Sequence, residues 1–390
     1  MKKIGITGQS GFIGTHLFNT LNLQKEVFQT IPFEDVFFND EEKLNHWVSQ
    51  CDVIVHLAAL NRHNEPHIIY DTNIRLVKQL IAACKETNSK PHIIFSSSKQ
   101  EERDNLYGRS KKEGREILIE WARRNNSQFT GLIIPNVFGP FGHPYYNSVV
   151  ATFCHQLTHG ESPKIETDAE MKLIYVGELV KEIISVAICN SLSVSNIEEV
   201  KQKNDTDSII KETFIIPHTS VMKVSGLLKK IQDYKIAYFE KGEIPPLNNT
   251  FERNLFNTFL CYLDHKTFFP FILKKNTDNR GSFIETIKLN SGGQVSFSTT
   301  VPDITRGNHF HIRKAERFAV IKGKALIELR KVGTDKVMSF ELDGETPSFV
   351  DMPIWYTHNI KNIGNEELYT IFWISEHFDA SDPDTFFEKV

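Results

Sequence analysis

The sequence predicts an α/β domain of the Rossmann type, with a doubly wound parallel sheet, followed by an all-β jelly-roll barrel. Three observations support this prediction. A glycine-rich turn separates a first apolar run from a first helical pattern near the N-terminus. Short apolar runs then alternate with longer helical segments as far as about Val186, which is typical of parallel sheets. From about Phe268 onward, apolar and polar residues alternate one by one, as they do in antiparallel barrels.

The first domain contains strands and helices in turn. Apolar runs predict buried strands at residues 3–7, 26–30, 52–57, 92–96 and 129–134. Apolar residues spaced three and four apart predict helices at residues 15–23, 68–86 and 111–124. Residues 191–211 are polar and charged, so we interpret this stretch as a loop or an insertion.

The second domain is marked by a change of pattern. Residues 325–330 and 368–373 alternate most clearly, and Gly, Asn and Asp interrupt such runs at short intervals. Pro245 and Pro246 come at the end of the first pattern. We therefore expect a nucleotide-binding domain with a substrate-binding part at residues 1–250, a linker at 251–267 and a barrel at 268–390.

Composition excludes several classes of protein. The formal net charge of -4 gives no reason to expect a nucleic-acid partner. No stretch approaches the roughly 20 apolar residues of a membrane span, and the apolar run after Met1 is too short for a signal peptide. The 5 cysteines are dispersed, which favours reduced thiols and a cytoplasmic location.

The glycine-rich turn comes directly after the first strand and contains Gly8, Gly11 and Gly14. Glycines at this place allow a tight turn, a close approach of the backbone to a pyrophosphate, and close packing of helix on strand. The helix that follows, entered through Phe12 and Ile13, offers unpaired N–H groups and its positive dipole end to phosphates. The sequence therefore predicts a dinucleotide-binding site.

The residue that contacts the adenosine ribose is less evident. NAD sites usually place Asp or Glu at the end of the second strand, about 20 residues further on. Glu34 has this spacing from Gly14, but it follows Pro32 and we expect it to lie beyond the strand. No Arg stands there to hold a 2′-phosphate either. These residues leave both NADPH and NADH open.

Tyr107 and Lys111 form the most informative pair in the first domain. Residues four apart on a helix share a face, so both side chains can point into one cleft. We expect the ammonium to lower the phenol pKa, which makes Tyr107 a usable proton donor and acceptor. Ser98 ends the strand before this helix, at the edge where open α/β sheets bind ligands. We expect its hydroxyl to hydrogen-bond a substrate carbonyl.

These features resemble the extended short-chain dehydrogenase/reductase superfamily, many of whose members act on nucleotide sugars. The stretch 52–59 is similar to the strand that runs over the adenine in that group, and the resemblance places Leu57 and Ala58 at the cofactor. It also implies that Lys111 holds the nicotinamide ribose. The interval from Ser98 to Tyr107 is short for the superfamily.

The second domain carries a set of metal-ligating residues. His309 and His311 alternate on a strand, so both imidazoles point to one face. Glu316 and His358 follow at the spacing of the two cupin motifs, although Trp355 stands where cupins usually have Gly. Three imidazoles and one carboxylate suit Zn, Mn, Fe or Ni. We favour Zn, because neutral His with a carboxylate is a common zinc set.

The whole chain resembles bifunctional capsular-polysaccharide enzymes that join such a reductase to a C-terminal cupin. The resemblance is carried by residues 56–62, 96–111, 146–154, 276–283, 307–309 and 378–386. It implies that the cupin inverts C3 of a UDP-2-acetamido-2,6-dideoxy-4-hexulose. It further implies that the reductase transfers hydride from NADPH to C4, which gives UDP-2-acetamido-2,6-dideoxy-L-talose for capsule or O-antigen synthesis.

The resemblance also gives partners and contacts. The UDP-sugar is the expected ligand, and a homodimer is expected from the fold family. Candidate contacts to the sugar or diphosphate are Asn61, Arg62, Asn136, Asn147 and Arg280.

Three alternatives stay open. The cupin could be a non-catalytic, metal-stapled dimerisation module. The chain could be a cofactor-bound scaffold without turnover, although a scaffold has no need of Tyr107, Lys111 and Ser98. It could also be a nucleotide-sugar dehydratase or 4-epimerase, because Glu101 and Glu102 lie where dehydratases carry acidic residues. The role of the metal, catalytic or structural, is open as well, and four protein ligands favour a structural one.

Overall fold

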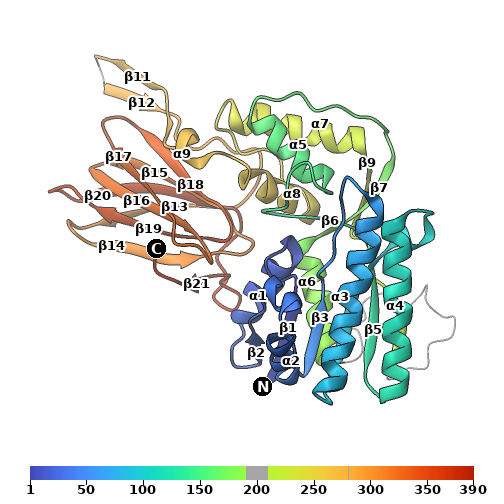
Figure 1. Cartoon of the computed structure of the whole chain (residues 1–390). Helices are drawn as coiled ribbons and strands as arrows, with labels where there is room; N and C mark the ends of the chain where they lie inside the picture. Colours follow the sequence, from blue (N-terminus) through green and yellow to red (C-terminus); the bar gives the residue numbers. More distant parts are fainter. Residues whose placement is uncertain (190–209, 280) are drawn as a thin grey trace. The chain divides into compact units, whose positions relative to one another are not determined.

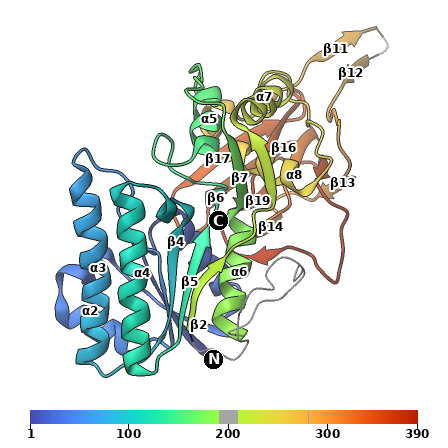
Figure 2. The ribbon, with the colours of Figure 1, turned by 90° about the vertical axis from the view of Figure 1, so that its right-hand side faces the viewer.

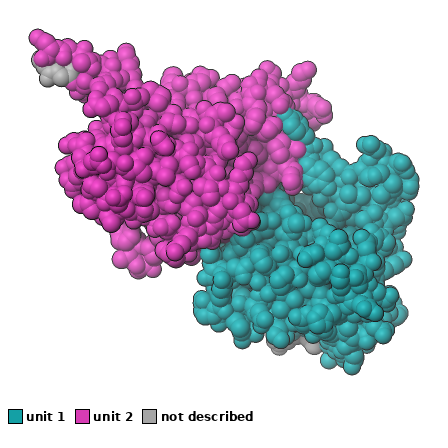
Figure 3. All heavy atoms as spheres, turned by 60° about the vertical axis from the view of Figure 1, so that its left-hand side comes forward, with its two compact units in different colours: residues 1–138, 145–148, 170–222 teal, residues 139–144, 149–169, 223–390 magenta. Residues whose placement is uncertain are grey.

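A computed structural model describes residues 1–189, 210–279 and 281–390 of the chain. These residues form two compact units, coloured separately in Figure 3. Unit 1 comprises Met1–Phe138, Tyr145–Ser148 and Glu170–Met222, and unit 2 comprises Gly139–Pro144, Val149–Ala169 and Lys223–Val390. Most of the stretch 191–211, which we interpret as a loop, lies outside the described residues. Its last two residues begin a strand, β8 (Ile210–Ile215).

Unit 1 is built on a six-stranded parallel sheet with the order β2-β1-β3-β4-β5-β8. Its other strands are β1 (Lys2–Thr7), β2 (Phe28–Ile31), β3 (Val53–His56), β4 (His92–Ser98) and β5 (Phe129–Ile134). Their central residues are apolar and buried, as is usual for a parallel sheet covered on both faces. The strand order reverses at β1, and ligands bind in such folds at the carboxyl ends beside this point. The sheet confirms the predicted Rossmann-type fold.

Helices cover both faces of this sheet. Helices α2, α3 and α4 pack side by side on one face (Figure 2), whereas α1 packs against α6 on the other. Their bounds are α1 Phe12–Asn22, α2 Glu41–Ser49, α3 Pro66–Glu86, α4 Leu106–Asn125 and α6 Val176–Cys189, with short 3-10 helices η1 Asp35–Asn39 and η2 Lys99–Glu102. A small sheet is formed by β6 Asn136–Phe138, β7 Glu170–Tyr175 and β9 Ser220–Lys223. None of the described helices is long and apolar enough to cross a membrane.

Unit 2 contains the predicted barrel, made of two five-stranded sheets (Figure 1). One sheet has the order β10-β18-β15-β20-β13, with bounds Phe271–Ile272, Ser348–Met352, Glu316–Lys322, Leu368–Ile374 and Gln294–Thr300. The other has the order β17-β16-β19-β14-β21, with bounds Val337–Asp343, Lys324–Lys331, Tyr356–Asn362, Thr305–Phe310 and Phe386–Phe387. A separate hairpin joins β11 (Lys275–Asp278) and β12 (Gly281–Ile284). The all-β prediction for this region is confirmed.

The helices of unit 2 include the stretch that we expected to be a linker. They are α5 Val149–Thr158, α7 Val224–Tyr234, the π-helix η3 Lys235–Phe239, α8 Thr250–Leu260 and α9 His265–Phe268. Residues 251–267 are therefore largely helical. Asn249 caps α8, because its Oδ1 accepts from the Glu252 N–H at 2.9 Å. The domain boundaries at 250 and 268 stay a prediction.

A buried ion pair holds these helices and the barrel in one unit. The Arg317 guanidinium on β15 donates to both carboxylate oxygens of Asp351 on β18, at 2.8 and 2.9 Å. It also donates to the Gly242 carbonyl at 2.6 Å, and Tyr238 of η3 donates to Asp351 at 2.5 Å. Because every partner is buried and hydrogen-bonded, loss of one would leave an uncompensated charge, at a cost of about 3–5 kcal/mol.

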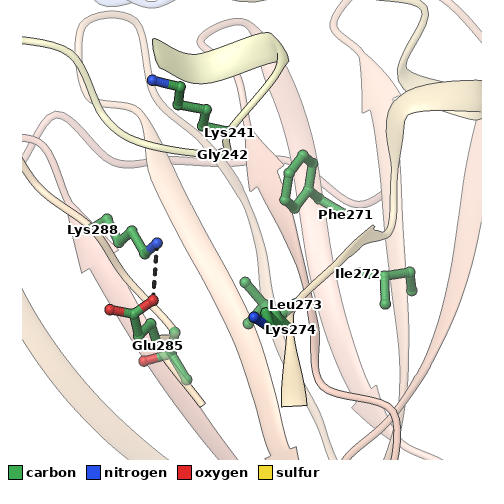
Figure 4. Close-up of a pocket in the computed structure, with 9 residues that line it drawn as sticks. Lys241, Gly242, Phe271, Ile272, Leu273, Lys274, Glu285 and Lys288 are labelled. Carbon is green, nitrogen blue, oxygen red and sulfur yellow. Dashed lines mark ion pairs between the residues drawn. The ribbon is translucent and has the colours of Figure 1, made fainter. Parts of the chain in front are cut away.

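A pocket in unit 2 includes Gly242 in its lining, the residue whose carbonyl accepts from Arg317. Figure 4 shows its lining, which combines three lysines and Glu285 with the apolar side chains of Phe271, Ile272 and Leu273. Glu285 in the lining pairs with Lys288 at 2.9 Å, so part of the positive charge of the pocket is compensated within the lining. The pocket shares no residue with the predicted catalytic or metal-ligating sets.

Candidate functional site

The glycine turn after β1 is shaped so that only glycine suits it. Gly8 has a φ of +67°, which side-chain-bearing residues seldom adopt. The Gly11 N–H donates to the Gly8 carbonyl at 3.0 Å and closes the turn. A Cβ on Gly14 would lie 2.2 Å from the Gly8 carbonyl oxygen. The turn thus brings the backbone against the start of α1, where a pyrophosphate needs close access.

The first turn of α1 offers its backbone to a ligand. Gly11 is the N-cap and makes no side-chain cap hydrogen bond to the N–H groups of the first turn, which contains Phe12 and Ile13. Such N–H groups and the positive end of the helix dipole bind phosphates. The residues present therefore fit a dinucleotide.

The end of β3 is fixed beside this turn. The Thr7 hydroxyl is 2.7 Å from Nδ1 of His56 and accepts from the Ala58 N–H at 3.3 Å. Leu57 donates its N–H to the Thr7 carbonyl at 3.2 Å. A Cβ on Gly8 would lie 2.9 Å from the Ala58 nitrogen. The predicted cofactor contacts Leu57 and Ala58 therefore lie directly against the glycine turn.

Helix α4 begins immediately after a tight connection from β4. Asn105 caps the helix by accepting from the Gly108 N–H at 2.7 Å. A Cβ on Gly108 would lie 1.9 Å from the Gln100 carbonyl oxygen, so η2 packs directly on the helix start. The short interval between Ser98 and Tyr107 is possible because a glycine follows the tyrosine.

Lys111 is buried one turn along α4. Its ammonium donates to the Ser96 carbonyl at 2.9 Å, and burial lowers the pKa of Lys111 to about 8. The same Nζ lies 5.9 Å from the centroid of the Tyr107 ring. The structure thus brings the predicted catalytic pair together on one face of the helix.

The expected lowering of the Tyr107 pKa is not found. Burial, with a smaller contribution from the Tyr146 hydroxyl, raises the pKa of Tyr107 to about 12. The cost of placing a phenolate in a low-dielectric site exceeds the attraction of the ammonium at this distance. Tyr107 is therefore a neutral phenol near pH 7, which is the form that donates a proton.

Ser98 is the most accessible of the three serines that end β4. Ser96 and Ser97 are buried, and Ser96 donates to the His56 carbonyl at 3.1 Å. Ser98 is half-buried, and its hydroxyl accepts from the Gln100 N–H at 3.2 Å, which leaves its own proton to donate. This geometry suits the predicted contact to a carbonyl oxygen.

The acidic residues after Ser98 have structural partners. Both carboxylate oxygens of Glu101 accept from Arg115, with the closest contact at 2.7 Å. Ser97 also donates to this carboxylate. Glu102 is exposed. Because Glu101 is held in a bidentate ion pair, it is poorly suited to the proton transfer that a dehydratase requires.

Asn73 on α3 is a positioning residue that the sequence analysis did not single out. Its amide donates to the Leu60 carbonyl at 3.1 Å and accepts from the Leu60 N–H at 2.7 Å. It also donates to the Ser110 hydroxyl at 3.0 Å, and Ser110 in turn donates to the Tyr107 carbonyl at 2.7 Å. The loop after β3 and the start of α4 are therefore linked through one buried amide. The signal that could have found it is a polar residue on the apolar face of a helix.

The predicted sugar contacts lie partly together. The Asn61 N–H donates to the Tyr146 hydroxyl at 3.2 Å, and Arg62 donates to the Tyr145 carbonyl at 3.2 Å. This brings the loop after β3 to the short segment that contains Asn147, which is exposed. Asn136 is the first residue of β6, and its side chain is exposed. Arg280 lies outside the described residues.

The four predicted metal ligands converge inside the barrel. One ligand atom from each of His309, His311, Glu316 and His358 lies within 4.8 Å of the others. A Glu316 carboxylate oxygen is 3.4 Å from His311 Nε2 and 3.1 Å from His358 Nε2. All three atoms are buried, yet none has a partner with hydrogen-bond geometry among the described residues. Buried polar atoms aimed at one point without hydrogen bonds fit a shared cation.

The outer nitrogens of two imidazoles orient them for this purpose. Nδ1 of His311 is 2.5 Å from the Asp384 carbonyl, and Nδ1 of His358 is 3.2 Å from the Tyr356 carbonyl. With a proton on each Nδ1, both Nε2 atoms present a lone pair to the centre. The set of donors matches a divalent cation.

Trp355, at the position where cupins usually have glycine, adopts a backbone conformation typical of glycine. Its φ is +63°, the left-handed conformation that glycine adopts freely. Its N–H donates to the His311 carbonyl at 2.8 Å, and its ring stacks on Phe310 with centroids 5.6 Å apart. Packing and hydrogen bonding therefore hold the turn that leads to His358.

Comparisons with known proteins agree with both halves of the chain. The NAD dependent epimerase/dehydratase family matches residues 4–190. The polysaccharide biosynthesis C-terminal domain matches residues 276–386. UDP-2-acetamido-2,6-beta-L-arabino-hexul-4-ose reductase from Pseudomonas aeruginosa is 29% identical over 98% of both chains. UDP-glucose 4-epimerase from Thermotoga maritima covers 67% of this chain and 98% of its own, at 19% identity and a TM-score of 0.52, which shows the fold alone.

One solved structure is similar over the full length. The capsular polysaccharide assembling protein CapF from Staphylococcus aureus is 32% identical, covers 100% of both chains and has a TM-score of 0.61. The resemblance predicted from the sequence is thereby confirmed. The chain belongs to the family of the capsular polysaccharide assembling protein CapF.

Proposed function

We propose that this chain is a bifunctional nucleotide-sugar enzyme that first inverts C3 and then reduces C4 of a UDP-2-acetamido-2,6-dideoxy-4-hexulose. The product would be UDP-2-acetamido-2,6-dideoxy-L-talose for capsule or O-antigen synthesis. The observation that carries the proposal is the Tyr107–Lys111 pair behind a glycine turn, in a chain similar end to end to a named hexulose reductase.

Reduction of C4 needs a hydride and a proton, and the nicotinamide cofactor supplies the hydride when bound. Tyr107, neutral because burial raises its pKa to about 12, donates its phenolic proton to the C4 oxygen. Ser98 donates a hydrogen bond to the same oxygen as negative charge develops there. The Lys111 ammonium stabilises the phenolate that remains. The choice between NADPH, which the resemblance implies, and NADH depends on the residues that face the adenosine ribose.

Inversion of C3 must precede the reduction. The proton on C3 is acidic only while C4 is a ketone, so reduction at C4 ends the exchange. Bound by His309, His311, Glu316 and His358, a divalent cation, for which we propose Zn, would stabilise the barrel and could act as a Lewis acid. Four protein ligands leave little open coordination, which favours the structural role.

The assignment of further residues and of assembly follows the resemblance. We propose Asn61, Arg62, Asn136, Asn147 and Arg280 as contacts to the UDP-sugar, and the glycine turn with Leu57 and Ala58 as the cofactor site. We also propose a cytoplasmic homodimer. A reductase with a non-catalytic cupin is the alternative. A dehydratase is disfavoured because Arg115 occupies both oxygens of Glu101.

One experiment tests both activities. The protein is mixed with a UDP-4-keto-6-deoxy-HexNAc and reduced nicotinamide nucleotide in deuterated water. We expect loss of the nicotinamide absorbance and deuterium at C3 of the product. Without the absorbance loss the reductase assignment is wrong, and without the deuterium the epimerase assignment is wrong.

A matched variant separates the two steps. Tyr107→Phe should abolish the absorbance change and leave deuterium exchange at C3 intact, because the barrel is unaltered. If chelation of the metal removes exchange while reduction of an already inverted sugar continues, the cupin is catalytic. If exchange persists after the metal is removed, the structural role is supported.

A further inference from the structure

The loop after β2 carries a carboxylate that lies against the glycine turn. The Ser10 hydroxyl donates to Oδ2 of Asp35 at 3.1 Å. Nearby, the Phe33 N–H donates to the side-chain oxygen of Gln9 at 3.0 Å. Both residues between Gly8 and Gly11 therefore hold this loop, which fixes where the Asp35 carboxylate lies.

This place is where Rossmann folds recognise the adenosine ribose. Strand β2 runs parallel to β1, with Gly5 paired to Ile31, so both strands end at the same edge. An acidic residue about 20 positions after the last glycine of the turn accepts from the ribose 2′-hydroxyl in NAD sites. The sequence suggested that no acidic residue stands at the strand end, because Pro32 follows it. In the structure the chain folds back after Pro32, and Asp35 reaches the turn.

The local charge favours a hydroxyl over a phosphate. Asp35 is exposed, and no described residue donates to its Oδ1, which can therefore accept from a ribose hydroxyl. Neither the turn, residues 8–14, nor the loop, residues 32–39, contains Lys or Arg. A 2′-phosphate beside Asp35 would face a like charge without a local cation to offset it.

We propose that Asp35 is the specificity-determining residue of the cofactor site and that this reductase prefers NADH to NADPH. The proposal rests on the nicotinamide-dependent function proposed above, but it departs from the NADPH that the family resemblance implies. It concerns binding of the adenosine half and does not depend on which sugar is reduced.

The test is a fluorescence titration of the full chain with NADH and with NADPH, without sugar. We expect the wild-type protein to bind NADH at least about tenfold more tightly than NADPH. Asp35→Asn keeps the shape and the Ser10 contact while it removes the charge, so NADPH should gain about tenfold relative to NADH. Glu34→Gln is the matched control, because Glu34 is exposed and makes no cap hydrogen bond. It should leave the ratio unchanged.

The outcomes are distinct. Tighter binding of NADPH by the wild type, or an unchanged ratio in Asp35→Asn, would overturn the assignment of Asp35. Should that variant fail to fold, the wild-type ratio alone still decides the preference. Binding of neither nucleotide would overturn this inference together with the proposed reductase. A preference for NADH in a protein that reduces no UDP-4-keto sugar would leave the inference intact and refute the proposed substrate.

Discussion

Replacing Lys111 by Met should slow the chemical step of reduction with little effect on folding. The change removes the ammonium that lies 5.9 Å from the Tyr107 ring and keeps a side chain of similar length. With the phenolate charge placed at the ring centroid and an effective dielectric constant of about 20, the ammonium stabilises it by about 2.8 kcal/mol. That energy corresponds to a factor of about 100, and to about 10 if half of the charge has developed in the transition state.

The assay is single-turnover oxidation of the reduced nicotinamide at saturating nucleotide and sugar. Saturation matters because the resemblance also places Lys111 at the nicotinamide ribose, where its loss would weaken binding. We expect the rate constant to fall by about 10-fold to 100-fold. Lys112→Met is the control, because Lys112 is adjacent and exposed. A rate within about threefold of wild type at saturation would refute the electrostatic role that we give to Lys111.

Three further predictions follow from the same geometry. The rate of reduction at saturation should fall as the pH rises through about 8, because the buried Lys111 ammonium loses its proton there. The Tyr107 phenol, with a pKa of about 12, keeps its proton over the same range. A flat profile to about pH 10 would contradict this prediction. Gly108→Ala should lower the free energy of unfolding, measured by urea titration, by about 2 kcal/mol, because the added Cβ would meet the Gln100 carbonyl. Gly226→Ala is the control and should be neutral or stabilising, because a Cβ at Gly226 would meet no described atom within 4 Å. Glu316→Gln should weaken binding of a divalent metal by at least tenfold in a chelator competition, and equal affinity in both proteins would argue against the cluster as a metal site.

The fold and the convergence of the site residues could be predicted because their signals are local. A buried parallel strand needs an apolar run, and the turn between β1 and α1 needs glycine where a Cβ would strike the backbone. The cupin ligands can be predicted for a similar reason, since alternation from His309 on β14 to His311, just beyond the end of that strand, directs both imidazoles to one side. In each case the physical constraint acts within a few residues of the chain.

The features that sequence reasoning missed depend on tertiary contacts. The chain folds back after Pro32 because Ser10 and Gln9 hold the loop, and nothing in the loop itself reports that contact. Residues 251–267 likewise form helix α8 for most of their length, and the apolar face of α8 is buried against other parts of unit 2. The same unit contains the buried pair Arg317 and Asp351. The role of a polar residue cannot be predicted from the spacing of residues in the sequence when its partner lies far along the chain.

The pKa of Tyr107 bears on the type of reaction. The positive charge of Lys111 favours the phenolate, but burial disfavours that charge and raises the pKa of Tyr107 to about 12. A 4-epimerase begins by oxidising the C4 hydroxyl, and for that step its tyrosine must accept a proton as phenolate. A ketoreductase begins with the neutral phenol as donor. Since burial raises the pKa of Tyr107 to about 12, the tyrosine holds its proton throughout the neutral range, as the proton donor of a ketoreductase must.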